Sequence, residues 1–67
     1  MKTHEIQGYV LVLNQVVHIT RVFTAPEEGF QFNIGLTSGT LIKLKYPDRA
    51  TAVLKRDLLI EAINDAP

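Results

Sequence analysis

The apolar positions of this chain change their spacing at Tyr46-Pro47. Before this dipeptide they recur at every second residue, which is the period of a β-strand with one buried face. After it they recur at intervals of three and four, which is the period of an amphipathic helix. The pattern predicts an α+β fold, a four-stranded antiparallel β-meander followed by one C-terminal α-helix packed on one sheet face. We expect strands at residues 6–13, 16–23, 30–36 and 41–46, and the helix at residues 48–63.

The third and fourth expected strands form a hairpin whose register follows from its apolar face. A two-residue loop would pair Ile34 with Lys43 and would place lysines on that face. A three-residue loop instead pairs Ile34 with Ile42, as a sheet with one buried side requires. The third residue of such a loop is usually left-handed, so Gly39 is predicted to have a positive φ angle. The remaining expected pairs are Phe30 with Tyr46 and Phe32 with Leu44.

The first two expected strands are less regular. Residues 10–13 are apolar on both faces of a strand, which indicates burial on both. Asn14-Gln15 is expected to form the turn into the second strand, because Asn tolerates a positive φ angle. The second strand mixes apolar and polar side chains on each face, and we expect a β-bulge to cause the mixture.

The helix carries two apolar stripes that compete for its buried face. Pro47 ends the preceding strand, and Asp48 is expected to cap the first turn. We assign the bulkier stripe to the sheet, with Arg56 at its centre. Arg56 is expected to lay its methylene groups along the core edge; the alternative is a buried ion pair or an anion contact. The bulkier stripe comprises Ala52, Val53, Arg56, Leu59, Ile60 and Ile63, and the second Ala50, Leu54, Leu58 and Ala62.

Length and composition narrow the class of protein. The 67 residues make one domain, residues 1–67, near the lower size limit for folding alone. There is no cysteine, so stability must come from packing, to which self-association could add. The 7 basic and 7 acidic residues give zero formal net charge, which argues against a general polyanion binder. Neither a signal peptide nor a run of ~20 apolar residues is recognised, so we expect a cytoplasmic protein without a membrane partner.

Residues that could carry catalysis or bind a metal are few. Ser38 has no histidine or acid close to it in the sequence, so a triad would need His4 or His18 from elsewhere in the fold. His4 and His18 with Glu5 could bind zinc or iron, but their spacing is not diagnostic. The chain also lacks a glycine-rich phosphate loop. We therefore expect neither enzymatic activity nor a cofactor nor a metal site.

A basic cluster offers an alternative function. Its lysines should share the outer sheet face with polar side chains, where they could contact a nucleic acid or a nucleotide. The aromatic residues Phe30, Phe32 and Tyr46 are expected on the opposite face, where they cannot stack on bases. A solvated outer face is therefore the favoured interpretation. The residues proposed for this contact are Lys43, Lys45, Arg49 and Arg56.

The apolar surface exceeds what one helix can cover. The first strand is apolar on both faces, is expected to be a sheet edge, and has no charged residue between Tyr9 and Leu13. Contiguous apolar surface on a small domain usually marks an interface. The alternative is that a twisted sheet curls round the helix and buries the excess. We expect a non-enzymatic interaction module of bacterial or phage type, which forms a homodimer or binds another protein through Val10, Val12, Leu54 and Leu58.

Overall fold

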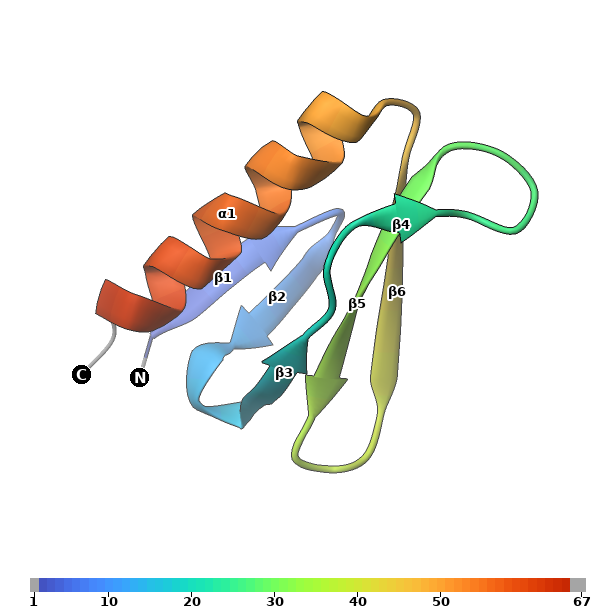
Figure 1. Ribbon diagram of the computed structural model, residues 1–67. Coiled ribbons are helices and arrows are strands. Elements are labelled where there is room, and N and C mark those ends of the chain that lie inside the picture. The colour runs from blue at the N-terminus through green and yellow to red at the C-terminus, as the bar shows by residue number, and fades with distance from the viewer. Residues whose placement is uncertain (1, 66–67) are drawn as a thin grey trace.

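The computed structural model describes residues 2–65 and confirms an α+β fold with antiparallel sheets and one C-terminal helix packed against a sheet (Figure 1). The single four-stranded meander is only partly matched, because the strands divide into two sheets. β1 and β2 form one sheet; β3, β4, β5 and β6 form the other, with β5 at its centre. The elements are β1 (Thr3–Ile6), β2 (Tyr9–Val12), a 3₁₀ turn (Leu13–Gln15), β3 (Val16–Ile19), β4 (Phe23–Thr24), β5 (Phe30–Leu36), β6 (Leu41–Tyr46) and α1 (Arg49–Asp65).

The β5–β6 hairpin has the predicted bounds and register. Ile34 lies opposite Ile42, with Phe32 opposite Leu44 and Phe30 opposite Tyr46. The Gly39 N–H donates to the Leu36 carbonyl over 2.9 Å, and Gly39 has a φ angle of 89°. The requirement for one apolar face therefore selected the correct loop length.

The predicted first strand, residues 6–13, is wrong. The chain turns at Gln7-Gly8, where both residues have positive φ angles of 49° and 83°, and β1 pairs back on β2. Two successive left-handed residues suit a tight hairpin, because their twist matches that of the flanking strands. The turn expected at Asn14-Gln15 is instead the 3₁₀ turn at Leu13–Gln15. The first strand is thus a separate hairpin rather than the edge of the larger sheet.

The predicted second strand is interrupted. Its register with β5 shifts between Val16 and His18, which confirms the expected bulge. At Thr20 the hydroxyl, rather than the carbonyl, accepts the N–H of Asn33 over 2.8 Å. The Thr20 carbonyl turns away and accepts the Nε–H of Arg56 over 2.8 Å. A side-chain group has replaced a backbone group in the ladder, so β3 ends there and pairing resumes only at β4.

The helix begins one residue after its cap and ends two residues beyond the predicted Ile63. The Asp48 carboxylate accepts the Thr51 N–H over 2.8 Å, as the cap prediction requires. The buried helix positions, Ala52 and Leu59, belong to the stripe that was assigned to the sheet. Arg56 is partly buried; it bonds a backbone carbonyl and approaches Asp57 at 3.8 Å, so it forms no buried ion pair.

The core lies between the larger sheet and two elements on one side of it. Figure 1 shows α1 and the β1–β2 hairpin on the same side of β5. The β1–β2 hairpin and α1 therefore cover the inner face of the sheet together, whereas the sequence predicted that the helix alone would cover it. Sheet residues Phe32, Ile34, Leu44 and Tyr46 pack with Ile6, Leu11 and Leu13 from the N-terminal part and with Ala52 and Leu59 from α1.

Replacing Gly39 with valine should lower the free energy of unfolding by about 1–2 kcal/mol, because a β-branched residue must adopt a left-handed conformation there. A Cβ atom at this position meets nothing within 4 Å, so the loss comes from the backbone alone. Gly39→Asn is the matched control and should lose less, since asparagine tolerates this region. Urea unfolding measures both. Equal losses for the two variants would contradict the backbone explanation.

The Asp48 cap should make the free energy of unfolding depend on pH. The Thr51 N–H first, and then the Thr51 hydroxyl, lowers the pKa of the Asp48 carboxyl below its ordinary value of 3.8. A carboxyl with a lowered folded-state pKa stabilises above its unfolded-state pKa and loses this contribution as pH falls through the folded-state value. The difference in urea midpoint between wild type and Asp48→Ala should therefore be present at pH 7 and shrink below pH 3.8. A constant difference across that range would contradict the charged cap.

Candidate protein-interaction surfaces

The predicted interface residues lie mostly on the surface. Val10 is 65% exposed in β2, Leu54 and Leu58 are 54% and 41% exposed on α1, and Val12 is half-buried. The alternation along β2 explains the exposure of Val10, because Leu11 points into the core and its neighbours in the strand must point outward. These positions are thus available to a partner, as an interface residue must be.

Glu5 of β1 lies next to both Val10 and Leu58. Val10 lies directly opposite Glu5 in the hairpin ladder. Glu5 and Leu58 both line a small depression of about 190 Å³ between β1 and α1. The two predicted apolar positions are therefore separated by a carboxylate, which breaks the apolar continuity expected between them.

The predicted basic cluster is divided between two sides of the sheet. Lys43 and Lys45 lie opposite Asn33 and Gln31 on the face that points away from the core. Arg56 instead reaches from α1 to the Thr20 carbonyl. The fourth member, Arg49, is exposed at the first position of α1. Only the two lysines therefore share the outer sheet face.

One aromatic residue does lie on this outer face. Phe23 of β4 is half-buried and is the cross-strand partner of Gln31, which in turn lies opposite Lys45. The sequence interpretation placed no aromatic residue there, because it could not assign faces in the irregular second strand. The alternation in β5 could have indicated the position of Phe23, since a residue directly opposite Gln31 must point to the same face as Gln31.

The two histidines lie on different elements. His4 is in β1 beside the small depression, and His18 is in β3 opposite Gly35. Within residues 2–65, no group of three or more His, Cys, Asp or Glu side chains could hold a metal ion. The Ser38 hydroxyl donates to Thr40 over 3.0 Å in the exposed turn, so its position gives no support for a nucleophile.

His18 packs its ring over Gly35. A Cβ atom added at Gly35 would overlap Cε1 of the His18 ring. The row His18, Gly35 and Leu41 therefore runs across the outer face of β3, β5 and β6 with a glycine at its centre. The absence of a side chain at residue 35 is what admits the ring.

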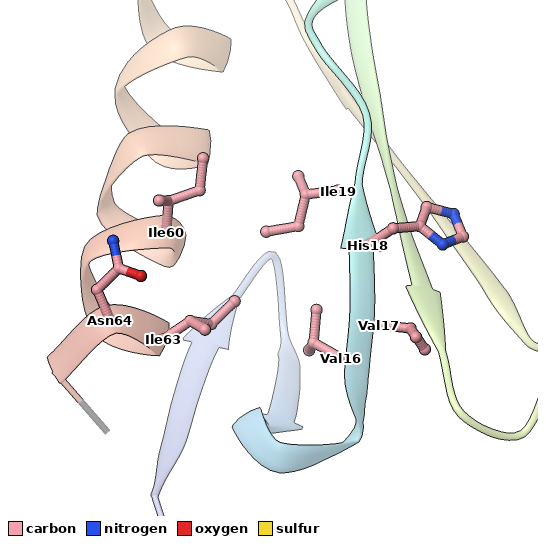
Figure 2. A pocket seen from close by; sticks show the side chains of 7 residues that line it. All are labelled: Val16, Val17, His18, Ile19, Ile60, Ile63 and Asn64. Carbon is pink, nitrogen blue, oxygen red and sulfur yellow. The ribbon is translucent and has the colours of Figure 1, made fainter. Parts of the chain in front are cut away.

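A groove between β3 and α1 is a surface that the sequence did not reveal. It has a volume of about 290 Å³ and runs beside the C-terminal half of α1 (Figure 2). Val16 and Ile19 point toward the helix in Figure 2, whereas Val17 and His18 point away from it. The bulge produces this order, because it places two successive residues on one face. The lining residues are Val16, Val17, His18, Ile19, Ile60, Ile63 and Asn64.

No helix within the described part of the chain is both long and apolar enough to cross a membrane.

Comparisons of the chain with known protein families, with curated proteins and with solved structures gave no significant match. The function must therefore be argued from the geometry of these surfaces.

The contact between His18 and Gly35 predicts a coupled pair of substitutions. Gly35→Ala should lower the free energy of unfolding by about 1 kcal/mol, because the ring must leave the sheet. The same change in a His18→Ala background should be neutral or stabilising, since alanine suits a strand better than glycine. Urea unfolding of the four proteins gives the coupling energy. Equal effects of Gly35→Ala in both backgrounds would contradict the packing described here.

Proposed function

We propose that this protein is a non-enzymatic protein-interaction module that self-associates, most simply as a homodimer. The observation that supports the proposal is the large apolar surface outside a small core. Single exposed apolar residues are ordinary, but here they occur on four elements. The exposed large apolar residues are Tyr9, Val10, Val17, Leu41, Val53, Leu54 and Leu58.

Size gives a physical reason for association. A chain of this length buries only roughly 60% of its unfolded surface, so its stability from packing is small. A partner that binds only the folded chain adds stability by mass action. Covering exposed apolar side chains would supply that free energy, at roughly 25 cal/mol for each Å² removed from water.

Open strand edges give a second reason. In the larger sheet, within residues 2–65, β3 and β6 each hydrogen-bond to β5 alone, so each has one unpaired edge. Unpaired N–H and C=O groups favour pairing with another chain. Apolar side chains and open edges together support protein binding over catalysis, which needs an enclosed pocket with converging polar groups.

Nucleic-acid or nucleotide binding is the second candidate. It is favoured by one observation, the row formed by Phe23, Gln31 and Lys45 on the outer sheet face. A ring and a lysine on the same sheet face, here with Gln31 between them, can stack on a base and contact a phosphate. The zero net charge and the separation of Arg56 from the lysines place this function second.

Self-association predicts that the mass measured by sedimentation equilibrium rises with concentration through the micromolar range. The thermal midpoint should rise with it, because dimerisation stabilises only the folded chain. Ultracentrifugation and calorimetry on the same samples check both. A monomer with a constant midpoint at every concentration would contradict the proposal.

The second candidate predicts a salt-sensitive complex with single-stranded RNA or DNA. Lys43→Glu and Lys45→Glu together should weaken it, whereas Lys55→Glu on the exposed side of α1 should not. Each phosphate contact that is lost should reduce the slope of log affinity against log salt by about 0.7 for single strands. Fluorescence anisotropy measures this slope. Absence of binding at low salt would remove the candidate.

A further inference from the structure

We infer that a second copy of this chain docks on the free edge of β3, antiparallel to it, and continues the sheet across a two-fold axis. The inference rests on the proposed self-association and names the surface that mediates it. β3 stands at the end of the strand order β3–β5–β4, so its other side has no hydrogen-bonded neighbour within residues 2–65.

The two edges of the larger sheet are protected differently. The β6 edge carries Lys43 and Lys45, and charged side chains deter pairing with another strand. The Gln7 side chain also donates to the Lys45 carbonyl over 2.6 Å, which occupies a backbone acceptor there. β3 has the sequence Val-Val-His-Ile, without lysine, arginine or acid. β3 is therefore the less protected of the two edges.

Backbone groups of β3 are directed to this edge. The Thr20 N–H bonds the Asn33 carbonyl of β5 over 2.9 Å. Successive residues of an antiparallel strand direct their backbone groups to opposite sides, so the N–H and C=O of Ile19 point away from β5. The Ile19 N–H is therefore placed to donate to the Val16 carbonyl of a strand added at the edge, whereas the Val16 N–H already donates to the Leu13 carbonyl of the 3₁₀ turn.

The order of side chains along β3 fits a second copy of itself. From Val16 to Ile19 the directions are toward the helix, away, away and toward the helix (Figure 2). This order reads the same in both directions. In a full antiparallel overlap Val16 lies opposite Ile19 of the other copy, and Val17 lies opposite His18. Residues directly opposite each other in a sheet must point to the same face. The order in β3 meets this requirement in the register just given. A strictly alternating strand of four residues would not, because its first and last side chains point to opposite faces.

The groove beside β3 extends the same interface. Ile60 and Ile63 of α1 line it together with Val16 and Ile19. Across the two-fold axis each groove would face its copy, so the apolar side chains of the two helices would cover one another. No lysine, arginine, aspartate or glutamate lines the groove, and two copies therefore bring no like charges together there.

The extent of this surface predicts a weak dimer. Stable interfaces use roughly 20–30 residues from each partner. The groove and β3 together supply the seven lining residues, with neighbours on α1. Such an area favours association in the micromolar range or weaker, in which free and paired chains coexist.

Cross-linking tests the geometry directly, because the chain has no cysteine of its own. In the proposed register the two copies of residue 17 have Cα atoms about 6 Å apart, from strand spacing and rise, which lies within the disulfide range. Val17→Cys should form a covalent dimer under mild oxidation. Val10→Cys is the matched control, since Val17 and Val10 are 62% and 65% exposed strand valines. The control should stay monomeric.

Charge substitutions supply the second measurement. Val17→Lys should weaken self-association by about tenfold or more, because like charges on adjacent strands destabilise pairing. Val10→Lys should leave it unchanged, and both variants should keep the wild-type urea midpoint at concentrations where the chain is monomeric, because both sites are exposed. A wild-type dimer that survives Val17→Lys, or that cross-links through Val10→Cys instead, would overturn the β3 interface while leaving the proposed function intact. A strictly monomeric wild type would overturn both.

Discussion

Burial of the inner face of β5 is the constraint on which the rest of the structure depends. Phe32 and Ile34 of this strand have no exposed surface, and neither has Leu44 beside them on β6. A four-stranded sheet alone leaves this face in water, so other elements must cover it. α1 covers part, and the β1–β2 hairpin folds over the remainder.

The packing of α1 and the β1–β2 hairpin on the sheet leaves a groove and strand edges uncovered. Thr20 and Arg56 link the end of β3 to α1 through the 2.8 Å bond to the Thr20 carbonyl. The groove lined by Ile19 and Ile60 lies between the same strand and helix. Open edges and apolar grooves are therefore products of the same packing that buries β5. They give the protein its means of binding other chains.

The sequence predicted the regular parts of this fold because their patterns are strict. Alternation in residues 30–36 and 41–46 fixed the hairpin register, and Pro47-Asp48 marked the start of the helix. Gln7-Gly8 was missed because the apolar run that follows it reads as part of one strand. Its signal was a glycine next to a polar residue, which is weaker than the usual Asn-Gly turn.

The candidate surfaces were less predictable for a physical reason. The exposure of Leu54 and Leu58 could be expected, because they belong to the second stripe of the helix, whereas Val10 lies in a run that was predicted to be buried on both faces and is 65% exposed. The groove at β3 instead depends on the approach of residues 16–19 and 60–64, which are far apart in the chain. The bulge could be expected from mixed faces, but the order of directions that it produces required the structure.

The most direct measurement is an isotope-filtered nuclear Overhauser experiment on a mixture of labelled and unlabelled protein at high concentration. It detects only contacts between copies. A dimer through β3 predicts intermolecular contacts between the methyl groups of Val16 and Ile19, which lie opposite each other across the two-fold axis. Intermolecular contacts confined to Val10, Leu54 or Leu58, or none at a concentration where the mass is dimeric, would contradict docking at the β3 edge.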